Sequence, residues 1–214
     1  MSKQGIARAE VTGAVLCGGV SRRMGTDKGG LMLGEESLVA RSVRALSLVS
    51  SEVLLSCGSE PKYSELGLRP VLDSCADAGP LAGITASMEA CDSEWLAVLA
   101  CDLPRIVSDV PSALLDHAAS LGLDVCMLSS DGQVEPLIAV YRRSCLWSMR
   151  EAIRLGLRRV DSFHSVPGED GRSLSVGVLE VAALPRGVRE LDVTMNLNTP
   201  AEFAVAITLN AETA

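Results

Sequence analysis

Short apolar runs, each with the length of a β-strand, are spaced along the first half of the chain. The runs over 11–16, 52–56 and 95–100 are nearly continuous in aliphatic residues and are bounded by polar residues or glycine. This pattern is typical of strands buried on both faces of a parallel sheet. Between the first two runs, residues 37–49 place apolar side chains at helical spacing, which predicts an amphipathic helix. Strand, helix and strand in this order predict a right-handed parallel unit, the start of a doubly wound α/β domain.

The rest of the chain continues this alternation. We predict strands over 69–72, at the edge of the sheet, and over 124–128 and 135–142. We predict helices from Gly79-Pro80, over 111–121 and over 144–155, and a short helix over 61–66. The polar, glycine-containing stretch over 165–175 is a loop rather than a linker, because strand-like and helical material resumes after it. We therefore predict one domain.

Composition narrows the classes of function. The 214 residues can bury a large core, which is aliphatic because 48% of the residues are hydrophobic and 3% aromatic. A net charge of −8 argues against binding nucleic acid or anionic membranes, which favour a basic surface. Seven scattered cysteines without a Cys-x-x-Cys pair favour free thiols in a reducing compartment. Residues 1–10 do not resemble a signal peptide and no apolar run has membrane-spanning length, so we expect a soluble, cytoplasmic protein.

A glycine-rich segment after the first predicted strand has the composition of a phosphate-binding loop. Cys17-Gly18-Gly19 ends the strand, and Arg22, Arg23 and Lys28 follow shortly after. Glycines let backbone N–H groups approach phosphate oxygens, and the cations offset charge that amides cannot neutralise. The segment predicts a triphosphate site. The alternative is a surface loop with ordinary solvated cations.

The spacing excludes two well-known phosphate loops. A Walker loop requires Gly-Lys-Ser/Thr at the start of a helix, but Lys28 lies between Asp27 and Gly29. A dinucleotide fingerprint requires Gly-x-Gly-x-x-Gly, which Gly18-Gly19 does not provide. The sequence LCGGVSRRMGTDKGG instead resembles the signature loop of the nucleotidyltransferases, most closely that of the molybdenum cofactor guanylyltransferase (MobA) family. It departs at Cys17, where alanine is usual, and this change spares a contact made by the backbone.

Two further predicted strands end at aspartates. Asp73 ends the edge strand, where carboxylates commonly bind ribose hydroxyls, and Gly79-Pro80 begins a helix whose free N–H groups can meet an anion. Asp102 follows the apolar run 95–100, where it either caps the next turn or, beside a triphosphate loop, binds a divalent cation. Mg²⁺ needs few protein carboxylates when phosphate oxygens and waters complete its ligands. The Gly-Pro-Leu-Ala-Gly and Cys-Asp-Leu-Pro sequences resemble the nucleotide-binding and metal-binding elements of the family.

Later segments resemble the side of the family that accepts the second substrate. The 135–142 strand and the Arg158-Arg159-Val160 corner match its pattern, although the two arginines could equally be a solvated pair. Asn196 and Asn198 match the Asn-x-Asn-Thr-Pro element, and the resemblance implies acceptor contacts. Ser56 replaces an asparagine that contacts the nucleotide in some members, which weakens that one contact.

The resemblance implies a single-domain, Rossmann-like nucleotidyltransferase fold over residues 10–209, with a mostly parallel central sheet and helices on both faces, after a flexible N-terminus over 1–9. It implies transfer of GMP from GTP to the molybdenum–molybdopterin cofactor, giving molybdopterin guanine dinucleotide and pyrophosphate, with Mg²⁺ or Mn²⁺ at Asp102. The implied catalytic residues are Arg23, Lys28 and Asp102, and the implied nucleotide-binding residues are Leu16, Cys17, Gly18, Gly19, Lys28, Asp73 and Asp102. A phosphate monoester is already anionic at neutral pH and needs no strong base, which suits a chain with two histidines.

Several alternatives stay open on sequence alone. The loop recognises phosphates rather than the base, so a CTP-dependent molybdopterin cytidylyltransferase or another nucleotidyltransferase fits it as well. A nucleotide-binding regulator without activity is the alternative outside the enzymes, but Lys28 and Asp102 in one chain favour catalysis. We expect a monomer, and the sequence does not decide whether a molybdenum insertase or adaptor protein delivers the acceptor.

Overall fold

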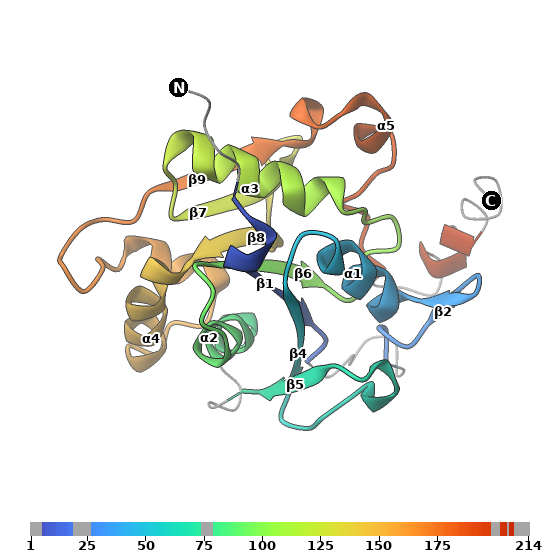
Figure 1. Ribbon diagram of the computed structural model, residues 1–214, viewed down its shortest axis with the longest axis horizontal. Helices are drawn as coiled ribbons and strands as arrows, with labels where there is room; N and C mark the ends of the chain where they lie inside the picture. The colour runs from blue at the N-terminus through green and yellow to red at the C-terminus, as the bar shows by residue number, and fades with distance from the viewer. Residues whose placement is uncertain (1–5, 19–26, 74–78, 198–201, 205, 208–214) are drawn as a thin grey trace.

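The protein is built on one central sheet of seven strands (Figure 1). The computed structural model describes residues 6–18, 27–73, 79–197, 202–204 and 206–207. In spatial order the strands are β5 (Arg69–Leu72), β4 (Glu52–Gly58), β1 (Val11–Leu16), β6 (Trp95–Ala100), β8 (Gln133–Arg142), β7 (Val125–Ser130) and β9 (Val176–Glu180). Neighbouring strands are parallel except where β8 pairs antiparallel with β6 and β7. The expected mostly parallel sheet, with the 69–72 strand at its edge, is confirmed.

Helices cover both faces of this sheet, as expected (Figure 1). Helices α1 (Leu38–Ser47) and α3 (Asp109–Leu121) pack on one face, and α2 (Pro80–Ala90) and α4 (Leu146–Arg154) pack on the other. The short helix α5 (Arg186–Arg189) follows β9. Single 3-10 turns are η1 (Arg8–Glu10), η2 (Ser64–Leu66), η3 (Arg143–Cys145), η4 (Val160–Ser165) and η5 (Val181–Ala183).

Strand β6 shows why the apolar runs in the sequence are continuous. All of its residues are buried. Leu96 and Val98 pack with α2 and α4, and Ala97 and Leu99 pack with α1 and α3. Because successive side chains of a strand point to opposite faces, a strand between two helical layers has no solvent side to keep polar.

Some boundaries differ from the sequence prediction. Helix α3 begins at Asp109, since Pro111 is tolerated within a first helical turn. Strand β7 continues through Ser130, beyond the predicted end at 128, so that only Asp131 and Gly132 separate it from β8. Both turn residues have positive φ, 50° and 77°, as a two-residue hairpin requires.

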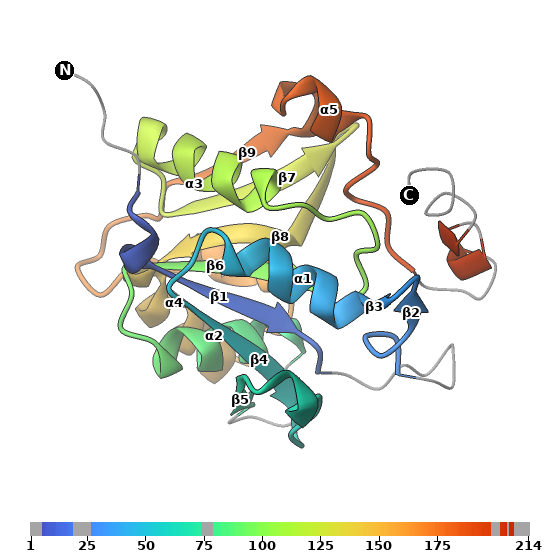
Figure 2. The ribbon, with the colours of Figure 1, turned by 45° about the vertical axis from the view of Figure 1, so that its right-hand side comes forward.

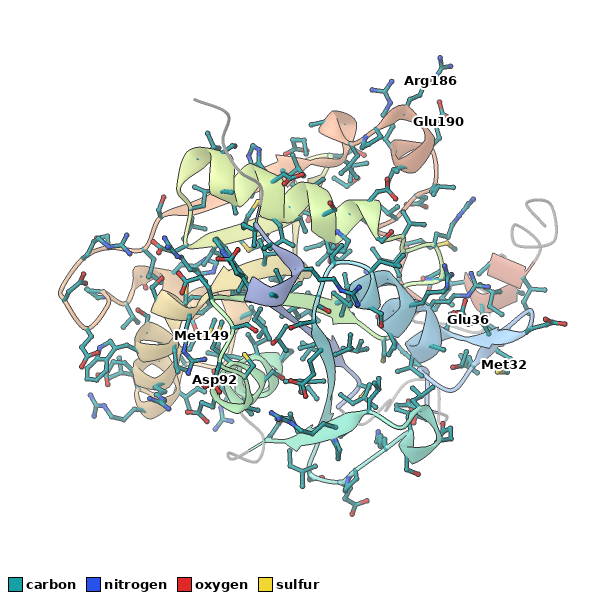
Figure 3. All side chains as sticks on the ribbon, in the orientation of Figure 1. Met32, Glu36, Asp92, Met149, Arg186 and Glu190 are labelled. Carbon is teal, nitrogen blue, oxygen red and sulfur yellow. The ribbon has the colours of Figure 1, made fainter. Side chains whose placement is uncertain are left out.

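A small hairpin after the glycine-rich segment was not predicted. Its strands are β2 (Met32–Leu33) and β3 (Glu36–Ser37), and Figure 3 labels Met32 and Glu36 on it. Figure 2 shows helical residues 202–204 and 206–207 beside this hairpin. Buried Leu33 and Leu38 pack there with Leu197 and Ala206. Residues 202–204 and 206–207 therefore lie against the hairpin that follows the glycine-rich segment.

The described part of the chain agrees with two further expectations. Six of the seven cysteines fall within it, and all six are free thiols. None of the helices there is long and apolar enough to span a membrane.

The first described residues are fixed to helix α1. The Arg8 guanidinium donates to the carbonyl oxygens of Ser47 and Ser50 at 2.5 and 2.6 Å, which ties η1 to the end of α1.

A buried carboxylate anchors the polar loop over 165–175. The Asp124 side chain is 2% exposed. It accepts hydrogen bonds from both terminal nitrogens of Arg172 at 2.9 and 3.0 Å, and from the Ser175 N–H and the Ser144 hydroxyl at 2.8 Å. Burial by itself raises the pKa of Asp124, but the hydrogen bonds, those of Arg172 first, lower it to about 2. The ionised carboxylate is therefore favoured in the folded protein.

This anchor makes stability depend on pH. The pKa of Asp124 is depressed in the folded chain, so its stabilisation is present above about pH 4 and is lost as the pH falls toward 2. At pH 7 we expect Asp124→Asn to lower the free energy of unfolding by about 2 kcal/mol in urea titrations, a gap that narrows below pH 4. Asp161→Asn is the control, because its ion pair with Arg159 is exposed and contributes little. Equal losses in the two variants would contradict the assignment.

Candidate active site

The carboxyl ends of four parallel strands form one edge, at which most of the predicted site residues lie. Backbone hydrogen bonds continue past the strands there: Cys17 N–H to Ser56 O at 2.9 Å, Asp73 N–H to Gly58 O at 2.8 Å, and Cys101 N–H to Leu16 O at 3.2 Å. These bonds fix the ends of β1, β4, β5 and β6 relative to one another. In open α/β sheets, ligands bind beyond this edge.

Gly18 begins the glycine-rich loop and lies against the end of β4. A Cβ atom at Gly18 would come within 2.6 Å of the Gly58 backbone nitrogen, so a side chain cannot fit. The preceding Cys17 is buried, with its Sγ 3.7 Å from that of Cys57. Because the Cys17 side chain points into the core, this residue can meet a ligand through its backbone alone. The departure from alanine at this position is therefore accommodated in the core.

Lys28 and Asp102, two of the three predicted catalytic residues, come together. The Lys28 ammonium lies 3.3 Å from the Asp102 carboxylate, and the side chains are 18% and 19% exposed. The Asp102 carbonyl accepts a hydrogen bond from Leu197 N–H at 3.2 Å, which brings the segment after α5 to the same place. The fold thus assembles a half-buried ion pair from segments 74 residues apart.

Asp73 lies where the sequence predicts a ribose-binding carboxylate. Its Oδ1 is buried, and none of the residues described in the structure donates a hydrogen bond to it. Burial raises the pKa of Asp73. Helix α2 passes close by, since a Cβ at Gly83 would lie 2.4 Å from Ser56 Oγ and 3.4 Å from Asp73 Oδ1. An acceptor without a donor is costly inside a protein, and a ligand hydroxyl would satisfy it.

The predicted acceptor residues are only partly described. The Asn196 side chain is half-buried and donates to Thr194 O at 3.2 Å, and the next residue, Leu197, bonds to Asp102. Asn196 therefore lies near the ion pair. Arg159 is exposed and pairs with Asp161 at 2.9 Å, which favours a solvated arginine.

Gly19, Arg23 and Asn198 lie outside the described residues, as does Arg22. Their roles therefore stay predictions from the sequence.

A metal at this edge would need ligands from a substrate. Among the described residues there is no group of three or more His, Cys, Asp or Glu side chains that could hold an ion. Asp102 offers one carboxylate beside the glycine-rich loop, which suits Mg²⁺ because this ion keeps several waters and binds phosphate oxygens. The donor set fits the predicted cation.

Sequence reasoning missed two residues at this edge. Strand β8 runs antiparallel to β6, with Ile138 opposite Leu99, and so carries Glu135 toward the end of β6 that precedes Asp102. Burial, and then the charge of Asp102, raise the pKa of Glu135. The second residue is Tyr63, whose phenol packs against Gly29. Only the antiparallel pairing of β8 reveals Glu135, and no local pattern indicates Tyr63.

Comparisons with known proteins agree with this geometry. A family profile described as MobA-like NTP transferase domain matches residues 13–167. A probable molybdenum cofactor guanylyltransferase of Pelotomaculum thermopropionicum is 32% identical over 92% of each chain. One of Carboxydothermus hydrogenoformans is 30% identical over 90% of this chain and 93% of the relative.

A solved structure is similar over nearly the whole fold. The crystal structure of molybdopterin-guanine dinucleotide biosynthesis protein A from Archaeoglobus fulgidus superposes with a TM-score of 0.78 at 26% identity. The match covers 94% of this chain and 99% of that one. With a profile matched over more than half of its length and relatives at 30% identity or above over most of it, the chain belongs to the MobA-like NTP transferase family.

Proposed function

We propose that this chain transfers GMP from GTP to the phosphate of the molybdenum–molybdopterin cofactor, forming molybdopterin guanine dinucleotide and releasing pyrophosphate. The names of its relatives support the substrates, and the structure supports a phosphoryl site. The observation that carries the proposal is the Lys28–Asp102 pair, which lies at the carboxyl ends of parallel strands beside a close-packed glycine.

The nucleotide is assigned to the loop and the strand ends. Backbone groups of Leu16, Cys17, Gly18 and Gly19 approach the nucleotide, since glycines and a buried Cys17 leave the main chain accessible. The unpaired Oδ1 of Asp73 accepts a ribose hydroxyl. Two observations place the sugar near β5: this unpaired acceptor, and the position of Asp73 at a strand end.

Asp102 is the residue that would hold Mg²⁺, with Mn²⁺ as an alternative. When bound, the ion supplies charge stabilisation at the phosphates. Lys28 and Asp102 hold each other in place while no triphosphate is bound, and a triphosphate competes for Lys28. This exchange frees the Asp102 carboxylate at the moment when phosphate charge enters the site.

The reaction needs alignment and neutralisation of charge more than a base. The acceptor is a phosphate monoester whose oxygen attacks the α-phosphorus, while the bond from that phosphorus to the pyrophosphate oxygen breaks. Lys28 and Arg23 offset the negative charge on the phosphates as this occurs. Asn196 and Asn198 are proposed to contact the acceptor, since the 196–197 segment is tied to the backbone of Asp102.

The setting of the reaction is also a proposal. We propose that the catalytic domain extends over 10–209 and that the chain acts as a cytoplasmic monomer. The expected flexible N-terminus over 1–9 does not extend to Arg8, whose side chain is tied to the end of α1. Delivery of the acceptor by a molybdenum insertase or adaptor protein fits this role.

The Asp102 assignment predicts a loss of chemistry without a loss of fold. We expect Asp102→Asn to lower Mg²⁺-dependent turnover on the order of 100-fold or more, because the amide keeps the shape but loses the charge. Pyrophosphate release at a series of Mg²⁺ concentrations measures the effect, and circular dichroism checks the fold. Asp116→Asn on the exposed side of α3 is the control. Turnover of Asp102→Asn close to that of the control would remove Asp102 from the metal site.

The loop assignment predicts that Gly18 admits no side chain. We expect Gly18→Ala to weaken GTP binding on the order of tenfold or more, because the added methyl group meets the Gly58 backbone and displaces the loop. Calorimetric titration with GTP measures the affinity. Gly187→Ala in α5 is a matched control, since its added Cβ meets no atom within 4 Å. Wild-type affinity in Gly18→Ala would show that nucleotide binds elsewhere.

The base specificity tests the function as a whole. With molybdopterin as acceptor, we expect GTP to be preferred over CTP on the order of a hundredfold, since two well-placed hydrogen bonds contribute a few kcal/mol and 1.4 kcal/mol is tenfold. Turnover is measured as pyrophosphate release with each of the four nucleotides. Equal or faster turnover with CTP would assign the chain to cytidylyl transfer. Nucleotide binding without any turnover would favour a regulator.

A further inference from the structure

Tyr63 has an unfavourable backbone conformation beside the proposed site. Its φ and ψ are 55° and 42°, in the left-handed region, immediately before the 3-10 turn η2. This conformation is sterically unfavourable for a residue with a side chain. Its hydroxyl is also buried near the Asp27 carboxylate, but no described residue forms a hydrogen bond of good geometry with it. Because both features are costly, favourable packing of the side chain must hold the residue in this position.

The ring of Tyr63 packs against the residue that follows Lys28. A Cβ on Gly29 would lie 2.5 Å from the Tyr63 hydroxyl oxygen and 3.1 Å from Cζ, with Cys101 Sγ at 3.3 Å. Gly29 adjoins Lys28, and Cys101 adjoins Asp102. The tip of the ring therefore lies between the two segments that carry the ion pair.

The same segment is also held by a hydrogen bond to α1 and by a tight turn of its own. Val39 N–H donates to Gly29 O at 2.9 Å, and Leu31 N–H donates to Lys28 O at 3.1 Å. The Lys62 ammonium, next to Tyr63 in sequence, lies 3.9 Å from the Asp27 carboxylate. Residues 27–29 are thus confined between the start of α1 and the 62–63 segment.

The phenol carries no charge into this region. Burial first, and then the neighbouring Asp27 carboxylate, raise the pKa of Tyr63 well above its ordinary value. The hydroxyl therefore stays protonated at physiological pH, and the ring does not repel phosphate groups. A neutral aromatic ring is suited to packing against backbone beside an anion site.

We propose that Tyr63 is a positioning residue, whose ring braces Gly29 and so fixes the Lys28 ammonium beside Asp102 and the incoming triphosphate. This inference rests on the proposed function, in which Lys28 meets the phosphates. It assigns Tyr63 no contact with substrate. Gly29 is required at its position because the ring occupies the space that a side chain would need.

The test is a double-mutant cycle between Tyr63 and Lys28. We expect Tyr63→Ala to lower kcat on the order of tenfold or more, because a displacement of about 1 Å in a charge-bearing group has effects of this size. Tyr63→Phe keeps the ring and should retain kcat within about threefold of the wild type. In a Lys28→Ala background, Tyr63→Ala should cause no further loss, since the group that it positions is gone.

The chain offers one matched control, because it contains two tyrosines. Tyr141 is fully buried on the opposite face, and its hydroxyl donates to Pro136 O at 2.6 Å. Tyr141→Phe should lower stability but leave kcat unchanged at a temperature at which it is folded. If Tyr63→Ala does not fold, Gly29→Ala takes its place in the cycle, because the added methyl group displaces the ring or the lysine backbone.

The outcomes separate this inference from the proposed function. If Lys28→Ala alone leaves turnover unchanged, the proposed function of the pair is wrong. If Lys28→Ala lowers turnover but the Tyr63→Ala loss is absent, or adds fully in the double variant, Lys28 acts without Tyr63 and the inference is overturned. A loss in Tyr63→Phe equal to that in Tyr63→Ala would also overturn it, since the hydroxyl rather than the ring would then be responsible.

Discussion

The parallel pairing of β1 with β4 on one side and β6 on the other is the constraint on which the site depends. The register places Leu16 opposite Ser56 and Ala100, so β1 and β6 end at one level and β4 continues two residues further, to Gly58. Gly18 then meets the end of β4, and Asp102 follows directly from β6. A shift of one residue would turn each buried side chain toward the wrong helical layer, so the core that stabilises the sheet also fixes the site.

The electrostatics of the site are local. The chain carries a net charge of −8, so its overall field does not attract a triphosphate. The Lys28–Asp102 pair instead keeps a cation and a carboxylate half-buried and close together, which limits the cost of desolvating either one. In the proposed function, substrate phosphate replaces Asp102 as the partner of Lys28, and the freed carboxylate would hold the metal.

Close packing of backbone explains the glycines at the site better than backbone conformation does. Gly18 lies against Gly58, Gly29 against Tyr63, and Gly83 against Ser56. None of these three has positive φ among the described glycines. At each of these glycines, a backbone or side-chain atom of another segment occupies the space that a side chain would need, and Tyr63 itself has a left-handed backbone conformation.

The sequence alone determined the features that have a local signal. Burial on both faces makes β1, β4 and β6 continuous apolar runs, and the rule for parallel strands then places Lys28, Asp73 and Asp102 at one edge. Only the tertiary structure decided that β8 enters the sheet antiparallel and brings Glu135 near Asp102, and that Tyr63 lies against Gly29. These contacts join residues more than 30 positions apart. Because the energy of such a contact depends on both segments, neither segment alone carries a sequence pattern that predicts it.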